Sequence, residues 1–391
     1  MEYLLIGVIL FLFFLVNFFF QKLHIPPLLA YILLGIGLAF FIDREMYDQL
    51  ENIGDIGIML LFFMLGLHYP LNHLLNISRR IWQVGTMDVL LNFGVTFLLA
   101  YWLGFGLFGS FIIGGVAYAS SSSITFKMME DTGRDKTPEG EFKVGLLIFE
   151  DIVAPVMVSF LVGFSLEGEI SGQAIALISV RVVLLITASV LIALYGFRKL
   201  ELFVNRYLSR DFMPLFTLAV AFAVAGIAIY LDLSKLLGAF LAGVILSETR
   251  ASSGMERFIE PIKNVTLPFF FFWFGASISF EAGISAPSLL LVLILWGLLA
   301  KVLVGLWGGR IYGLTWKGSL RAAFSLGQRG EFSVVIAALG DPALRAFSGI
   351  YILVTAMIGV LNFHRAPEYA ENTYLKLKKV LPGLFTNGKN L

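Results

Sequence analysis

Long apolar segments recur from one end of this chain to the other, and they constrain its fold more than any other feature. About 20 apolar residues in a helix cross the ~30 Å hydrocarbon core of a bilayer. The 391 residues are 58% hydrophobic and only 14% charged, which is too apolar for a soluble domain of this size. The sequence therefore predicts an all-α polytopic membrane protein.

Thirteen membrane-spanning helices are expected. They cover 2–20, 25–42, 51–69, 81–103, 106–129, 142–165, 173–197, 212–231, 234–248, 264–280, 287–309, 317–340 and 344–362. Lysine and arginine concentrate in the connections that follow odd-numbered spans, whereas Arg44, Lys235 and Arg345 alone lie around the others. By the positive-inside rule, the N-terminus is expected outside and the C-terminus in the cytoplasm.

Two adjacent carboxylates, Glu150 and Asp151, interrupt the apolar run 144–164 in the sixth span. An ionised carboxylate at the bilayer centre costs at least a few kcal/mol, so such a pair usually faces a water-filled cavity and binds a cation. The alternative is a pair neutralised by a buried basic residue on another helix. Lys301, at similar depth in the eleventh span, needs an acidic partner. These three residues predict a proton and cation site.

The fifth and twelfth spans carry polar residues near mid-membrane. In the fifth, Ser120–Ser123 can bond the backbone groups that an unwound helix releases, although a continuous helix with packed serines is the alternative. The polar set in the twelfth is Gln328, Arg329 and Glu331, with Gly327 and Gly330 beside them. It indicates non-helical backbone buried in protein. For Arg329 and Glu331 a structural salt bridge that clamps this segment is favoured over gating or binding.

Spans 4–6 and 11–13 form two matching triplets, each with an interrupted middle helix. The first triplet begins at the cytoplasm and the second outside, which is typical of an inverted-repeat transporter with its site at the midplane. In the fourth span, Asp88 and Asn92 lie one helical turn apart. They are expected either to line this core or to make a structural hydrogen bond.

Six segments, read in chain order, carry a family resemblance. They are LLFFMLGLHYPLNHL, AYASSSSITFKMMEDTGR, LLIFEDIVAPV, LLGAFLAGVILSET, AKVLVGLWGGRIYGLT and GQRGEFSVVI. Over residues 1–362 the sequence resembles the monovalent cation:proton antiporter-2 family, which has the sodium/proton-antiporter fold. Its potassium-efflux-type K⁺/H⁺ antiporters look closest, without their C-terminal nucleotide-binding domain. The resemblance implies two crossed broken helices and a prokaryotic plasma (inner) membrane.

The resemblance also implies roles for individual residues. Asp151 would bind the ion and shuttle protons, and Glu150 stands where that branch has glutamine. The implied ion- and proton-binding set is Asp151, Glu150, Ser121, Ser122, Ser123 and Thr125, with the monovalent cation at Asp151 and Ser122. The implied charge-compensating or gating set is Lys301, Arg329, Glu331 and Gln328.

The implied domains are two groups of scaffold and dimerisation helices, two groups of core helices, a linker and a tail. The scaffold covers 1–75 and 206–282, the core 81–165 and 287–362, the linker helix 173–199 and the cytoplasmic tail 363–391. A homodimer in contact with membrane lipid is expected. The alternatives for regulation are a separate cytoplasmic nucleotide-binding regulatory subunit, as in some relatives, or no such gate.

The function expected is secondary active antiport of a monovalent cation against protons, by alternating access of the core against the scaffold. K⁺/H⁺ exchange is favoured and Na⁺/H⁺ exchange is the alternative, with no cofactor besides these substrate ions. A regulated cation channel does not need paired carboxylates beside a lysine, and a sodium-coupled organic-anion symporter does not need the lysine. No nucleophile–base set indicates an enzyme, and no motif indicates nucleic-acid binding.

Overall fold

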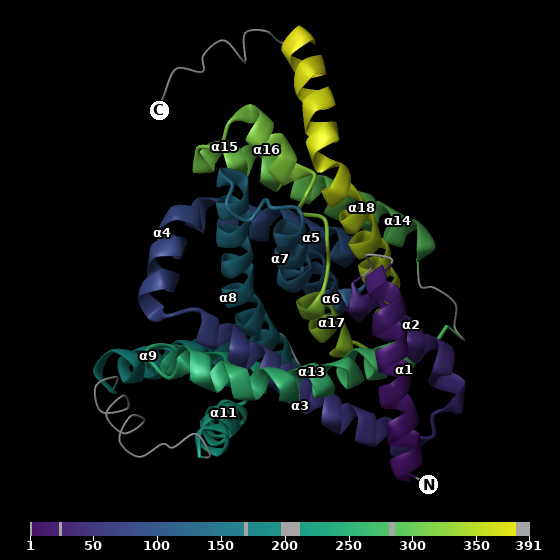
Figure 1. The fold of residues 1–391 in the computed structure, drawn as a ribbon, viewed down its shortest axis with the longest axis vertical. Helices are drawn as coiled ribbons and strands as arrows, with labels where there is room; N and C mark the ends of the chain where they lie inside the picture. Colours follow the sequence, from purple (N-terminus) through teal and green to yellow (C-terminus); the bar gives the residue numbers. More distant parts are fainter. Residues whose placement is uncertain (1, 23–25, 168–170, 197–211, 281–285, 381–391) are drawn as a thin grey trace. The chain divides into compact units, whose positions relative to one another are not determined.

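The computed structural model describes residues 2–22, 26–167, 171–196, 212–280 and 286–380 (Figure 1). Every regular element in these residues is a helix. Seven helices are long and apolar enough to cross a membrane, and four shorter apolar helices lie at Ile6–Phe20, Pro27–Phe41, Gly106–Tyr118 and Lys235–Ser247. The predicted all-helical, multi-pass character is confirmed, whereas the count of thirteen spans stays a prediction.

The chain divides into two compact units, the first made of Met1–Leu75 and Val153–Ser279. Its helices are α1 (Glu2–Lys22), α2 (Pro27–Leu38), α3 (Arg44–His68), α9 (Gly172–Leu191), α11 (Met213–Tyr230), α12 (Lys235–Ser247) and α13 (Ser252–Ala276). Helix α3 packs against both α12 and α13. A Cβ on Gly66 would meet the carbonyl of Phe240, and one on Gly243 would meet that of Phe63, so glycine lets these backbones touch.

The second unit comprises Asn76–Ile152 and Phe280–Leu391. Its helices are α4 (Leu71–Asp88), α5 (Val95–Trp102), α6 (Gly106–Tyr118), α7 (Ser122–Asp131), α8 (Pro138–Glu167), α14 (Pro287–Leu303), α15 (Gly309–Tyr312), α16 (Trp316–Ala323), α17 (Glu331–Ala338) and α18 (Pro342–Val380). One buried apolar cluster joins α4, α8 and the segment from α14 to α16. It includes Ile81, Val84, Phe142, Leu146, Val304 and Leu326.

The same order of helix types occurs twice in this second unit. A helix with a π-helical turn comes first, at Val89–Gly94 between α4 and α5 and at Val304–Gly308 between α14 and α15. A broken helix follows, α6 and α7 in one half and α16 and α17 in the other, and then one long helix, α8 or α18. This order matches the two predicted triplets.

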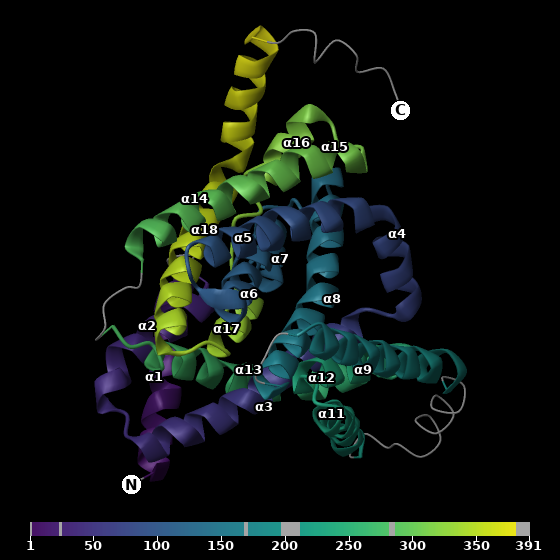
Figure 2. The ribbon, with the colours of Figure 1, turned by 180° about the vertical axis from the view of Figure 1, so that it is seen from behind.

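Two expected boundaries differ from the structure. Helix α18 does not end at 362 but continues to Val380, so most of the expected tail is helix, and it projects past α16 (Figure 2). The division between units falls inside α8, which groups 153–165 with the first unit. The scaffold and core roles stay predictions, and 1, 23–25, 197–199, 206–211, 281–282 and 381–391 of the expected domains lie outside the described residues.

Candidate functional site

The fifth and twelfth spans are both broken, and the two breaks pair with each other. Helix α6 ends at Tyr118 and α7 begins at Ser122, while α16 ends at Ala323 and α17 begins at Glu331. The unwound segments form an antiparallel bridge in which the Ser121 backbone N–H donates to the Gln328 carbonyl at 2.9 Å. The predicted interruption of both helices is therefore confirmed. Some of the backbone groups released by one break are satisfied by the other.

Side chains of α17 complete the bonding at both ends of the α6–α7 break. Glu331 accepts hydrogen bonds from the hydroxyls of Ser121 and Ser123, each at 2.8 Å, at the start of α7. Ser333 donates to the carbonyls of Val116 and Ala119, at 2.8 and 3.1 Å, at the end of α6. A carboxylate at a helix start and a donor at a helix end supply the partners that helix termini lack. Figure 2 shows α6, α7 and α17 together.

Arg329 is fully buried, and it does not pair with Glu331. Its guanidinium donates to Asn92 Oδ1 at 3.1 Å and to the carbonyls of Tyr118 and Gly297, both at 3.4 Å. The expected salt bridge of Arg329 and Glu331 was therefore wrong. Arg329 and Glu331, on either side of Gly330 at the break, point in different directions, and each finds a partner on another element of the unit. Arg329 still clamps the break, but it does so through an amide and two backbone carbonyls.

The acid pair on α8 meets the α6–α7 break through two serines. Glu150 Oε2 accepts from the Ser120 backbone N–H at 2.5 Å, and its Oε1 lies 3.3 Å from the Ser120 hydroxyl. Asp151 Oδ1 accepts from the Ser122 hydroxyl at 2.7 Å. Both carboxylates are buried, with exposed fractions of 1% and 0%. The two neighbours in sequence thus contact different residues of one unwound segment.

Lys301 lies between two carboxylates, one of which the sequence did not indicate as its partner. Its Nζ is 2.9 Å from Glu150 Oε1, and 2.9 and 3.0 Å from the two oxygens of Asp88. Asp88 also accepts from Asn92 Nδ2 at 2.8 Å, which is the hydrogen bond expected from their spacing. Asp88 is the sole charged residue of the fourth span, and that isolation is a signal that could have pointed to a buried cationic partner.

Two further oxygens of the expected site have no hydrogen-bond partner among the described residues. They are the hydroxyl of Thr125 and the amide oxygen of Gln328, both buried. The Gln328 amide nitrogen lies 3.9 Å from the sulfur of Met128, one turn of α7 beyond Thr125. Buried polar atoms are usually paired in a folded protein, so these oxygens are candidate ligands for a cation.

Together these residues form a buried cluster with more acid than base. Its four carboxylates are Asp88, Glu150, Asp151 and Glu331, and its two cations are Lys301 and Arg329, each at most 6% exposed. Ionising all six groups would leave an excess of two negative charges in a buried place. Such a cluster is suited to holding protons or monovalent cations as exchangeable counter-ions. The π-helical turns begin at or near two of its members, Asp88 and Lys301, a common position for such turns.

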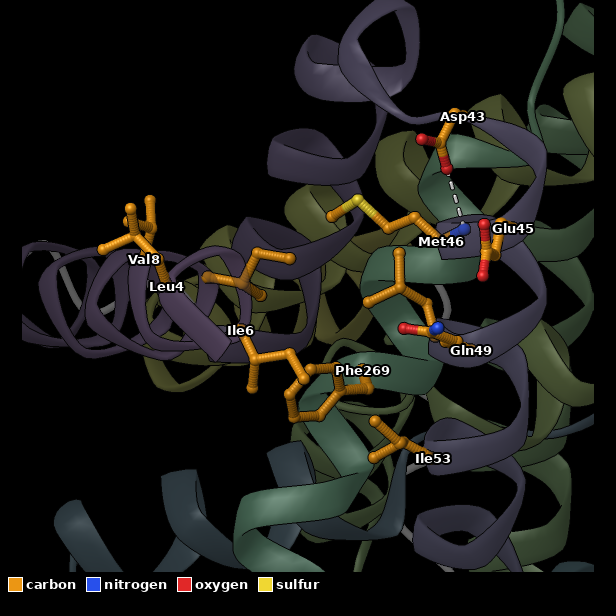
Figure 3. A pocket seen from close by; sticks show the side chains of 11 residues that line it. Leu4, Ile6, Val8, Asp43, Glu45, Met46, Gln49, Ile53 and Phe269 are labelled. Carbon is orange, nitrogen blue, oxygen red and sulfur yellow. Dashed lines mark hydrogen bonds between the residues drawn. The ribbon is translucent and has the colours of Figure 1, made fainter. Parts of the chain in front are cut away.

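A separate pocket of ≈ 460 Å³ opens in the first unit, where the start of α1 faces the start of α3 (Figure 3). Its wall is largely apolar, with Leu4, Ile6 and Phe269 among the lining residues. The acid at its rim, Asp43, accepts from the Met46 backbone N–H at 2.8 Å and so caps α3. No member of the buried acid–base cluster lines this pocket, so we do not assign the ion site to it.

Comparison with known families is decisive for the class of protein. Residues 7–363 match the family described as sodium/hydrogen exchanger, transmembrane. The chain belongs to this exchanger family. It is therefore a multi-pass membrane transporter and not an enzyme. The structure resembles that of the sodium proton antiporter MjNhaP1 from Methanocaldococcus jannaschii, with a TM-score of 0.71, 17% identity, and coverage of 95% of this chain and 99% of the other. The predicted antiporter fold is thereby confirmed.

Two bacterial relatives in the exchanger family cover most of the chain. The ammonium/H⁺ antiporter subunit AmhT of Alkalihalophilus pseudofirmus is 44% identical over 95% of each chain. The K⁺/H⁺ antiporter subunit KhtU of Bacillus subtilis is 31% identical over 88% of this chain and 84% of its own. Both names describe monovalent cation/proton antiporters. Ammonium was not among the ions expected from the sequence.

Proposed function

We propose that the protein exchanges a monovalent cation for protons, with Asp151 as the carboxylate that both compete for. The observation that carries this proposal is the buried acid pair beside the paired helix breaks. The Ser122 hydroxyl donates a hydrogen bond to Asp151 Oδ1 at 2.7 Å. Unwound backbone inside a helical membrane protein lines a cavity or is buried in protein. The Ser122 hydroxyl at the first break therefore offers an oxygen ligand beside a carboxylate where an ion would bind.

Exchange follows from the electrostatics of such a site. An empty, ionised carboxylate crosses the hydrocarbon poorly, whereas the same group neutralised by a proton or a cation crosses at much lower cost. The site then changes access only when it is loaded with one or the other. One transport cycle consists of two changes of access in opposite directions. The site carries a cation in one direction and a proton in the other.

The transported ion is proposed to be a large, weakly hydrated cation, K⁺ or NH₄⁺. A site that mixes serine hydroxyls, backbone carbonyls and a carboxylate has a weaker field than carboxylates alone, and it favours ions that lose water easily. The relatives named for ammonium and for K⁺ support this order, with Na⁺ as the runner-up. The unpaired oxygens of Thr125 and Gln328 suit NH₄⁺ in particular, because it donates hydrogen bonds.

Proton flux in proteoliposomes tests the function and the ion together. After a pH jump, NH₄⁺ and K⁺ should each drive proton movement with an apparent affinity at least about fivefold higher than that of Na⁺, because dehydrating Na⁺ costs more. A clear preference for Na⁺ would refute the ion assignment. Proton movement that needs no cation, or cation movement that needs no pH change, would refute antiport altogether and favour a channel.

A partner subunit and a homodimer are part of the proposal. Two relatives are named as antiporter subunits, which supports a separate regulatory polypeptide. The part of α18 beyond 362 offers it a rigid surface, because an ion pair of Glu371 with Lys317 and a ring contact of Tyr369 with Phe324 hold it on α16. Cross-linking in native membranes should trap a dimer, and a monomer there would contradict the proposed symmetric assembly.

A further inference from the structure

We propose that Asp88 is the permanent counter-ion of Lys301, so that Glu150 can be either ionised or neutral without stranding the lysine. This inference rests on the proposed exchange of a cation for protons. It gives Asp88 the part of a positioning residue, since it acts through Lys301 and does not touch the transported ion.

The geometry favours Asp88 over Glu150 as the lasting partner of the lysine. Lys301 Nζ contacts both oxygens of Asp88, at 2.9 and 3.0 Å, but only Oε1 of Glu150, at 2.9 Å. All three side chains are at most 1% exposed. A two-oxygen contact survives small displacements better than a single one, because one of its bonds can lengthen while the other holds.

The second partners of the two acids also differ. Asp88 is held by Asn92 at 2.8 Å, and Arg329 in turn holds Asn92 at 3.1 Å, so the acid belongs to a chain of fixed, fully buried groups. Glu150 instead receives its other bonds from the N–H and hydroxyl of Ser120, inside the unwound segment. Glu150 is therefore fastened to the part of the site that contacts Asp151 through Ser122.

The charged groups around Glu150 come from each element that packs on it. They are Lys301 from α14, Asp88 from α4 and Asp151 beside it on α8, with the Tyr118 ring 5.7 Å from the lysine Nζ. Arg329 from the second break is linked to Asp88 through Asn92. Removing one partner of a buried ion pair strands the other charge, which is strongly unfavourable. With Glu150 alone as partner, protonating Glu150 would strand Lys301. With Asp88 present, the lysine stays paired whichever state Glu150 adopts.

A consequence for the transport cycle follows. Lys301 keeps its proton throughout, so a cation that loads near the acid pair does not expel it. The lysine then contributes no second proton. Because Glu150 keeps one protonation state through the cycle, exchange is one for one and insensitive to voltage. Glu150 stands in the place where the potassium-efflux branch has a neutral glutamine.

Proton flux in proteoliposomes tests this with Glu150→Gln, Asp88→Asn and their combination. Glu150→Gln should lower exchange by less than about tenfold and leave it insensitive to voltage, because Lys301 keeps Asp88. In the combined variant, the fold-loss of proton flux should exceed the product of the two single fold-losses by at least about tenfold, because the two residues are coupled. Asp88→Glu, which keeps a carboxylate at this position, should recover the voltage-insensitive flux that Asp88→Asn loses. Losses that simply multiply, or a Glu150→Gln variant that is dead, would overturn the proposal.

Thermal unfolding of the purified full chain gives a readout that does not depend on transport. Asp88→Asn should lower the Tm, and adding Lys301→Gln should recover at least about half of the loss, because no buried charge is then stranded. Asp131→Asn, which removes an exposed partner of Lys127, is the matched control and should leave the Tm unchanged. No recovery by Lys301→Gln would overturn the pairing. A wild type without cation-driven proton flux would remove the proposed function, while this Tm pattern would still decide the role of Asp88.

Discussion

At the scale of single residues, Glu150 and Asp151 show how neighbours in sequence acquire different tasks. Glu150 contacts an ammonium group, that of Lys301, and a backbone N–H, whereas Asp151 accepts from the hydroxyl of Ser122. The Ser122 hydroxyl is a neutral oxygen ligand beside Asp151, whereas Glu150 contacts a fixed cation. We therefore place exchange at Asp151, and Glu150 sets the local charge.

Asp151→Asn should abolish cation-driven proton flux, with a loss of at least about 100-fold. The amide carries no charge, so neither a proton nor a cation binds to it as a counter-ion. The Tm should change little, since asparagine keeps the size of the side chain and can accept from Ser122. Flux and Tm measured side by side check this, with Asp131→Asn as the exposed control. Normal exchange in Asp151→Asn would place the ion site elsewhere.

Sequence reasoning went far for some residues and stopped short for others. The isolated acids and the lysine could be found because charge in an apolar run is itself the signal. The partner of Lys301 could not, because Asp88 lies 213 positions away and its spacing to Asn92 already offered a local explanation. The error over Arg329 and Glu331 has the same cause, since closeness in sequence says little about the direction of two side chains where the helix is broken.

At the scale of elements, the two breaks form one structure and not two. Each break is too polar to exist alone in hydrocarbon, and their pairing, with Glu331 and Ser333 of α17 at the ends of α6 and α7, provides internal partners. Serines and glycines in the sequence predicted the two breaks. The sequence did not predict the π-helical turns or the continuation of α18 to Val380, because both depend on packing against other helices.

Gly330→Ala tests the pairing of the breaks. A Cβ there would collide with the Cβ and hydroxyl of Ser121 and push the segments apart. We expect a loss of about 1–3 kcal/mol in the free energy of unfolding, as for other overpacked sites, together with reduced proton flux. Gly226→Ala in α11 meets nothing within 4 Å and is the matched control. Equal Tm values for the two variants would show that the breaks do not need their close approach.

At the scale of the whole molecule, α8 and α4 are helices that cross from one unit to the other, and α8 is the one that carries the acid pair. Its first half carries Glu150 and Asp151, and the division falls between Ile152 and Val153. Pro155 follows three residues later inside the same helix. Proline has no N–H to donate to the carbonyl of residue 151, so the helix is weakened where one unit gives way to the other. The proposed alternating access would need movement between the proposed core and the proposed scaffold, and we infer that α8 bends at this point when the site changes sides.

Pro155→Ala should therefore stiffen α8 and slow transport. Restoring the helical hydrogen bond is expected to raise the free energy of unfolding by up to about 3 kcal/mol, the cost of proline in a helix interior. Proton flux at saturating cation should fall about fivefold or more while the apparent cation affinity stays unchanged, because the step that slows is the conformational one. Pro367→Ala, an exposed proline inside α18, is the matched control and should stabilise its helix without changing flux. A Pro155→Ala variant that is more stable and equally fast would rule out bending at this proline as part of transport.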